Sequence, residues 1–144
     1  MTLTEEQFLQ LDTVEQECFH GSWTREMLLE EINNPLSVLV TEQRDDRIVG
    51  FALGRVVADE GELYQIGVLP EYRRLHIGGK LLGDLHEKMK GRGAVCCFLE
   101  VRSRNAAAIA LYEKSGYERI SVRKGYYDDD DAVIFRAQLR ADTI

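Results

Sequence analysis

The sequence contains no long apolar run, and this absence argues against an ordinary membrane protein. No apolar stretch approaches the ~20 residues that a helix needs to cross a bilayer. The first residues, "MTLTEEQF", are acidic and helical in pattern, unlike a secretory signal peptide. We therefore expect a cytoplasmic protein without a membrane partner.

Positive charge and metal-binding side chains are also scarce. The 144 residues carry a formal net charge of −7, which argues against a nucleic-acid partner, since such binding usually needs a basic face. The adjacent Cys96 and Cys97 would point to opposite faces of a strand and cannot form a simple bridge. No CxxC pair or Cys/His cluster occurs, and His20, His76 and His86 are scattered. We expect no metal.

What the sequence does contain is typical of one globular domain. Hydrophobic residues make up 44% and charged residues 30% of the chain, as in ordinary globular proteins. A length of 144 residues suits a single buried core. No repeat or linker is visible, so we expect one domain over residues 1–144. Periodicity and cap signals predict helices from Thr4 to about 20 and from Ser22 or Thr24 to about 33, strands at 36–42, 47–57 and 62–69, a helix at about 76–90, a fully buried strand at 94–101, a helix from Asn105 to Ser115, and strands at 117–122 and 132–139.

The order of these elements predicts a mixed α/β fold. Short turns between the first three strands indicate an antiparallel meander. The strand–helix–strand unit at 62–101 should form a right-handed parallel crossover. We therefore expect a central sheet that is antiparallel at its N-terminal strands and parallel at its centre, flanked by about four helices.

The stretch "EYRRLHIGGKLL" (71–82) combines two arginines, two glycines and a helix start. Helix N-termini offer unpaired N–H groups and partial positive charge, and glycines let a ligand approach the backbone, so these are the parts of a phosphate cradle. A basic surface loop with a glycine for tight helix packing explains the same residues equally well. The stretch is neither a Walker A motif nor GxGxxG.

Several segments in order resemble one known superfamily. "VLPEYRRLHIGGKLL" is similar to the acyl-CoA-binding segment of the GNAT N-acetyltransferases, [Q/R]-x-x-G-x-[G/A], with Arg73 first, Gly78 last and His76 in place of the first glycine. "HGSWT", "IGV", "FLEVRSRNAAAIALYEKSGYE" and "RKGYYDDDDAVIF" resemble the RimI-type ribosomal-protein-alanine branch. The resemblance covers about residues 5–139 and implies the GNAT fold.

The resemblance implies acetyl-CoA as cosubstrate and identifies the residues that would bind it. Backbone groups of the third strand would pair with the pantetheine arm as an added strand does, and the helix start would bind the diphosphate. The implied cofactor-binding residues are Ile66, Gly67, Val68, Arg73, Arg74, Leu75, His76, Ile77, Gly78, Gly79, Lys80 and Asn105. Asn105 would also cap its helix, and capping alone could explain it.

Two side chains are candidates for acid–base catalysis. Glu100 ends an apolar strand, where partial desolvation would make a carboxylate more basic; the alternative is an ion pair with Arg102 or another arginine. The resemblance makes Glu100 the general base, acting directly or through water. It makes Tyr112 the acid that protonates the departing CoA thiolate, whereas Ala108 and Leu111 on the same helix face suggest a core aromatic instead.

The acceptor is the least defined part. At pH 7 about one in six α-amines with a pKa near ~7.7 is neutral, whereas fewer than one in a thousand lysine side chains with a pKa near ~10.4 are neutral. A single modest base therefore suits a protein N-terminus as the acceptor. The resemblance suggests a ribosomal protein. Trp23, Tyr126 and Tyr127 would contact the peptide; "DDDD" (128–131) could attract a basic one or form a solvated turn. A small amine or lysine acceptor, or a CoA-binding module without catalysis, remain alternatives. We expect a monomer or weak dimer.

Overall fold

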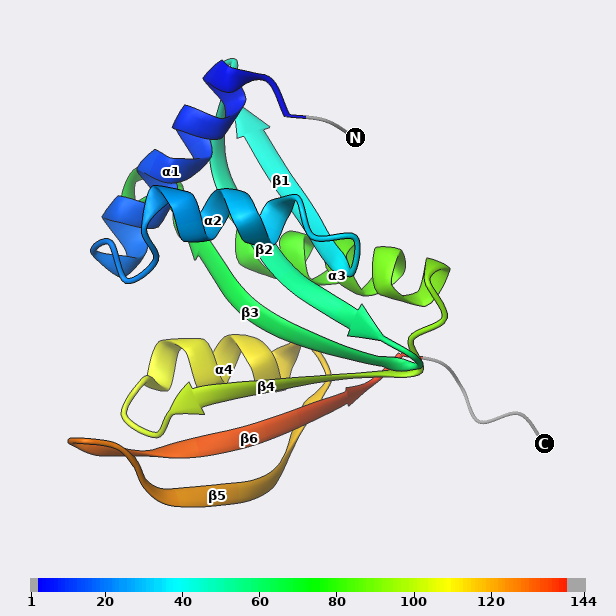
Figure 1. The fold of residues 1–144 in the computed structure, drawn as a ribbon. Coiled ribbons are helices and arrows are strands. Elements are labelled where there is room, and N and C mark those ends of the chain that lie inside the picture. Colours follow the sequence, from blue (N-terminus) through cyan, green and yellow to red (C-terminus); the bar gives the residue numbers. More distant parts are fainter. Residues whose placement is uncertain (1–2, 140–144) are drawn as a thin grey trace.

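Six strands and four α-helices are present within residues 3–139, which are the residues described by the computed structural model. The strands form one sheet of order β1-β2-β3-β4-β6-β5 (Figure 1). This confirms the expected mixed α/β architecture. The elements are α1 (Glu5–Phe19), α2 (Arg25–Ile32), β1 (Ser37–Arg44), β2 (Arg47–Val57), β3 (Glu60–Val68), a 3-10 turn (Pro70–Tyr72), α3 (Ile77–Gly91), β4 (Cys96–Arg102), α4 (Ala106–Lys114), β5 (Tyr117–Tyr127) and β6 (Asp130–Gln138).

Local capping sets the first two helices, as predicted. The Gln7 N–H donates to Thr4 Oγ1 at 3.1 Å and the Thr4 N–H donates to Gln7 Oε1 at 2.9 Å, which forms a capping box at the start of α1. Thr24 caps α2 by accepting from the Met27 N–H at 3.1 Å. Between the helices lies the loop 20–24.

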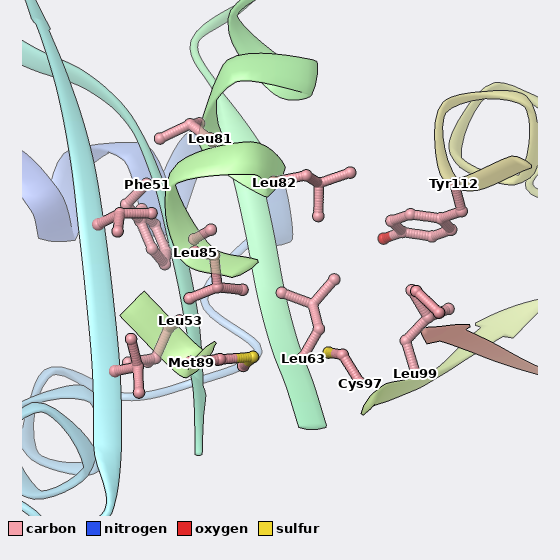
Figure 2. Packing of buried hydrophobic residues seen from close by; sticks show 14 of the residues in the cluster. Phe51, Leu53, Leu63, Leu81, Leu82, Leu85, Met89, Cys97, Leu99 and Tyr112 are labelled. Atoms are coloured by element: carbon pink, nitrogen blue, oxygen red, sulfur yellow. The ribbon is translucent and has the colours of Figure 1, made fainter. Parts of the chain in front are cut away.

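Helices cover both faces of the antiparallel strands β1, β2 and β3. α1 and α2 lie on one side of these strands, and α3 crosses behind them (Figure 1). The amphipathic pattern of α3 explains its packing, because its apolar residues point at the sheet. Figure 2 shows this layer together with strand residues and one tyrosine of α4: Leu81, Leu82, Leu85, Met89, Leu63, Cys97, Leu99 and Tyr112.

The second half of the sheet is covered on one face only. β4 and β5 both pair antiparallel with β6, and α4 packs over them through Tyr112. On the other face Glu100 and Arg102 are exposed and Phe98 is half-buried. The expectation of a fully buried strand at 94–101 was therefore wrong at Phe98 and Glu100, because no helix within residues 3–139 lies over that face of β4.

The only parallel strand pair in residues 3–139 is also the shortest. Glu60–Glu62 pair with Cys96–Phe98, and beyond that point β3 and β4 diverge (Figure 1). A bulge accompanies the divergence: Leu63 pairs with Gly54 and Gln65 with Leu53, so that Tyr64 is the extra residue. The result is an opening in the middle of the sheet.

The last two strands are longer than predicted. β5 continues through Tyr127 and β6 begins at Asp130, so the turn consists of Asp128 and Asp129 rather than the whole segment 125–131. None of the described helices has the length and apolarity required to cross a membrane.

Candidate active site

A cleft of about 1040 Å³ opens where β3 and β4 diverge. Its walls come from the end of α1, the edge of β3, the start of α3, the end of β4 and the length of α4. Of the residues predicted to bind or react, those that line it are Ile66, Gly67, Val68, Arg73, Arg74, His76, Ile77, Gly78, Gly79, Glu100, Asn105, Tyr112 and Tyr127. Leu75, Lys80, Trp23 and Tyr126 are not among its lining residues.

The start of α3 presents free donors to the cleft. The first hydrogen bond of the helix runs from the Lys80 N–H to the His76 carbonyl at 3.2 Å, so the N–H groups of Ile77, Gly78 and Gly79 have no carbonyl within the helix. A side-chain carbon added at Gly79 would meet nothing within 4 Å. An anion can therefore approach these donors closely, and the helix dipole favours its charge.

His76 adopts a conformation that usually belongs to glycine. Its φ is 62° and its ψ 20°, in the left-handed region, and Arg74 has a φ of 67°. A residue with a side chain pays roughly 1–2 kcal/mol in this region. The backbone at His76 therefore has the left-handed conformation that the glycine of the sequence pattern would adopt, although the residue here is a histidine.

Gly78 has a packing role. A carbon added at Gly78 would lie 3.2 Å from Leu111 Cδ2 of α4, tighter than most such contacts. The alternative explanation given for the glycines, close helix packing, thus applies to Gly78, whereas Gly79 borders open space.

The basic side chains near the cradle have different surroundings. Arg73 lines the cleft, where its Nε donates to the Val68 carbonyl at 2.9 Å. Lys80 is turned away, because its ammonium bonds to Glu42 at 2.9 Å and to Asp84 at 3.0 Å. Leu75 is exposed outside the cleft.

The edge of β3 that diverges from β4 turns backbone groups toward the cleft. The Leu69 N–H donates to the Val49 carbonyl at 2.8 Å on the β2 side, so by alternation Ile66 and Val68 face the opposite edge, toward the cleft. The Val68 carbonyl already accepts from Arg73 and from the Cys18 thiol at 3.3 Å. Ile66 is thus the better placed of the two to pair with an extended ligand.

Tyr112 is both a core residue and a cleft residue. Its side chain is 8% exposed and its ring lies 5.8 Å from the Tyr117 ring and 6.4 Å from that of Phe135. Figure 2 shows its hydroxyl pointing from α4 toward Leu82, across the opening. Burial raises the pKa of Tyr112 to about 12. At the start of the same helix, Asn105 accepts from the Ala108 N–H at 3.1 Å and also lines the cleft.

Glu100 is less buried than its position in the sequence suggested. Its side chain is 30% exposed, and Arg123 of β5 lies 3.4 Å from Glu100 Oε1. The ion pair proposed as an alternative therefore exists, with Arg123 rather than Arg102. The accessible carboxylate still faces the cleft that Tyr112 enters from α4.

An aromatic rim borders the Glu100 side of the cleft. The Arg102 guanidinium lies 4.1 Å from the centre of the Tyr127 ring, and Tyr126 packs edge-on against Tyr127 at 5.1 Å. Trp23 of the loop 20–24 lies 6.3 Å from the ring of Tyr64. Of these four rings, those of Tyr64 and Tyr127 line the cleft, whereas Trp23 lines a separate, smaller pocket beside α2.

Most of the acidic run is engaged in local contacts. Asp129 pairs with Arg102 at 2.6 Å, Asp130 accepts from the Ser103 hydroxyl and from the Arg104 N–H, and Asp131 accepts from the Gly125 N–H at 2.8 Å. These contacts join the β5–β6 turn to the end of β4. They support the turn interpretation more than that of a surface for basic peptides.

Among the lining residues that sequence reasoning missed are Cys18, Tyr64, Gln65 and His86. The polar pair at 64–65 inside the apolar segment "ELYQIGV" was a usable signal for Tyr64 and Gln65. His86 had none, since its Nε2 lies 2.7 Å from the hydroxyl of Tyr117, 31 residues away. Within residues 3–139 no group of three or more His, Cys, Asp or Glu side chains could hold a metal ion.

Known proteins resemble this chain in sequence and in structure. The acetyltransferase (GNAT) family profile matches residues 8–117. The [ribosomal protein bS18]-alanine N-acetyltransferase of Salmonella typhimurium is 44% identical over 94 residues, which cover 62% of this chain and 64% of that enzyme. The enzyme of the same name from Haemophilus ducreyi is 34% identical over 134 residues, covering 90% and 89%.

A solved structure extends the likeness to nearly the whole chain. The crystal structure of the ribosomal-protein-S18-alanine N-acetyltransferase from Escherichia coli matches with a TM-score of 0.88 and 29% identity, covering 99% of this chain and 94% of that one. The Salmonella alignment, by contrast, spans just under two thirds of that relative's own length.

Proposed function

The chain belongs to the acetyltransferase (GNAT) family, and on that premise we propose that it transfers acetyl from acetyl-CoA to the α-amine of a protein N-terminus. One observation carries the proposal. Glu100 of β4 and Tyr112 of α4 line a single cleft, whose far end is the donor-rich start of α3. A base, an acid and an anion site are the parts that direct acetyl transfer needs.

The residues around the cleft fit acetyl-CoA. The N–H groups of Ile77, Gly78 and Gly79 would bind the diphosphate, aided by Arg74, and the open space at Gly79 leaves room for it. The free edge of β3 at Ile66 would pair with the pantetheine amides in the manner of an added strand. This arrangement leads the thioester toward Glu100 and Tyr112.

Acetyl-CoA supplies the thioester carbon that the amine attacks, and its C–S bond breaks as the new C–N bond forms. Glu100 takes the proton that the amine must lose, directly or through a water. Tyr112 gives its hydroxyl proton to the departing sulfur. With the Tyr112 pKa at about 12, transfer to a thiolate near ~8.5 is uphill by about 5 kcal/mol, and burial of the thiolate reduces this difference.

A protein N-terminus is the acceptor that we favour. The relatives from Salmonella and Haemophilus are named for the alanine of ribosomal protein bS18, and a ribosomal protein is therefore the first partner to test. Tyr127 lines the cleft and packs against Tyr126, and Trp23 packs near Tyr64, a second lining residue, so these rings offer flat surfaces to a peptide. An α-amine also needs only the modest base that an accessible carboxylate provides.

The deciding experiment is a peptide panel. The purified protein is incubated with acetyl-CoA and a peptide copying the N-terminus of ribosomal protein bS18, and free CoA thiol is measured. We expect turnover with this peptide. We expect little turnover with a control peptide that is acetylated at its N-terminus and carries one lysine. Glu100→Gln and Tyr112→Phe should each show a large loss of rate. Binding of acetyl-CoA without turnover of any peptide or small amine would contradict the proposal.

A further inference from the structure

A buried polar cluster lies between α1, the loop 20–24 and β3. We call this loop the acceptor loop, because the proposed function assigns its Trp23 to the acceptor peptide. Glu15 of α1 is 0% exposed and Gln65 of β3 is 6% exposed. Glu15 Oε1 accepts from the Trp23 N–H at 3.0 Å and from Gln65 Nε2 at 3.2 Å. One carboxyl group thus joins the loop that carries Trp23 to a strand residue that lines the cleft.

Two oxygens of this cluster have no partner among residues 3–139. They are Glu15 Oε2 and Gln65 Oε1, both buried. An ionised carboxylate and an amide oxygen are acceptors only, and a buried acceptor left unpaired is costly. A single proton on Glu15 Oε2 changes one of the two acceptors into a donor and leaves the other to receive it.

We propose that Glu15 is a neutral carboxylic acid that forms a cyclic acid–amide pair with Gln65, and that this pair is the positioning device of the acceptor loop. The Gln65 amide donates to Oε1 and the Glu15 acid donates to the Gln65 oxygen, so that each group is satisfied. The effect on acceptor binding rests on the proposed function; the protonation state of Glu15 does not.

The surroundings favour the neutral form. Burial raises the pKa of Glu15, and the charge of Asp12 raises it further, against the lowering effect of the Gln65 amide, the Trp23 N–H and the nearby Ser22 hydroxyl. A proton retained at this site removes a charge that would otherwise be buried without a cation.

The charged and titratable neighbours do not supply that cation. Arg25 of α2 forms an ion pair with Asp12, with Arg25 Nε 3.0 Å from Asp12 Oδ2. Cys18, one turn further along α1, carries a thiol bonded to the Val68 carbonyl. Arg73 Nη2 lies 3.7 Å from that thiol and Arg73 Nε donates to the same carbonyl, so this guanidinium is engaged by Cys18 and Val68. From the sheet, the residue paired with Gln65 is Leu53, which is apolar.

The location explains why the pair matters for the acceptor. Gln65 follows the bulged Tyr64, whose ring contacts that of Trp23 at 6.3 Å. The acid–amide pair therefore ties the backbone of the acceptor loop to the strand at the point where an acceptor would enter. Loss of the pair releases the loop without touching Glu100 or Tyr112.

The first test is the stability of Glu15→Gln as a function of pH, with Glu17→Gln at an exposed position of α1 as the matched control. Above the unfolded pKa of ~4.3 the unfolded wild-type chain loses the Glu15 proton while the folded chain keeps it. Its folding constant therefore falls, relative to Glu15→Gln, by up to tenfold per pH unit until the folded group also ionises. Glu17→Gln should show no such trend. The proposal would be overturned if the folding constant of the wild type, divided by that of Glu15→Gln, rose with pH or did not change with pH. Failure of Glu15→Gln to fold would also overturn it.

The second test exchanges the two groups. Gln65→Glu places two carboxyls together and should lower stability at pH 7.5, and the double variant Glu15→Gln/Gln65→Glu should recover most of the loss, since one acid and one amide are again present. No recovery would contradict the pair.

The third test is kinetic. Glu15→Ala should raise the KM for the peptide about tenfold or more while the KM for acetyl-CoA stays within twofold, and Glu15→Gln should keep the peptide KM within about threefold of wild type. Equal effects on both substrates would refute a positioning role. If no acceptor is turned over, the proposed function fails, and the pH and exchange tests still decide the protonation state of Glu15.

Discussion

The guanidinium of Arg123 on β5 lies 3.4 Å from the carboxylate of Glu100 on β4. The two strands are not neighbours, since β6 lies between them. Both side chains are substantially exposed, 58% for Arg123 and 30% for Glu100, so the pair contributes about 1 kcal/mol or less to stability. Its consequence is positional: it restrains Glu100 beside the cleft while leaving the carboxylate open to a water or an amine.

Glu100→Gln should lower kcat/KM by about 10²–10⁴-fold, because the amide cannot accept the proton of the amine. The free energy of unfolding should change by less than about 1 kcal/mol, which equilibrium urea denaturation measures. Glu118→Gln, an exposed position on β5, is the matched control and should leave both quantities unchanged. A Glu100→Gln variant with full activity would remove this residue from the mechanism.

His76→Gly should stabilise the protein by about 1 kcal/mol, because glycine occupies a φ of 62° without the strain that a side chain meets there. His76→Ala is the control, since it removes the imidazole and keeps the strain. Denaturant midpoints compare the two variants, and calorimetry with acetyl-CoA shows whether the imidazole affects binding. Equal midpoints for the glycine and alanine variants would mean that the left-handed backbone is not strained.

Gly79→Ala should separate stability from binding. Alanine favours the helix over glycine by up to about 1 kcal/mol, and the new methyl group meets nothing, so the melting temperature should rise. The same methyl group enters the space where we propose that the diphosphate lies, so the affinity for acetyl-CoA should fall about tenfold. Gly78→Ala instead meets Leu111 at 3.2 Å and should not raise the melting temperature. Unchanged affinity in Gly79→Ala would place the diphosphate elsewhere.

His86 should make the protein less stable in acid. Burial lowers its pKa to about 4, while the unfolded value is near 6.5. Between these values the unfolded chain binds a proton that the folded chain does not, so stability is lost as pH falls from about 6.5 to about 4, by roughly 3 kcal/mol. His86→Gln lacks this titration. Its free energy of unfolding, measured by urea denaturation, should therefore fall by roughly 3 kcal/mol less than that of the wild type over the same pH range. Parallel curves would refute the prediction.

The elements of this fold could be predicted because short-range interactions determine them. The capping box of Thr4 and Gln7, the cap of Thr24 and the cap of Asn105 each join residues three positions apart, and the apolar period of α3 identifies its buried face. The strand and helix order then implied the mixed sheet. Errors occurred where a neighbouring layer decides the outcome. The outer face of β4 has no helix over it in the part of the chain that the structure describes, and the segment after Val122 continues as strand because β6 pairs with it.

The sequence by itself determined where the helices begin and end, how helices and strands succeed one another along the chain, and the likeness to an acetyltransferase, because all of these depend on neighbouring residues. Only the tertiary structure decided that Lys80 turns away to Glu42, that Arg123 rather than Arg102 meets Glu100, and that Glu15 meets Gln65. The physical reason is distance along the chain. Contacts between residues 23 to 50 positions apart depend on how twist, bulge and helix packing orient each side chain, and no local pattern encodes those directions.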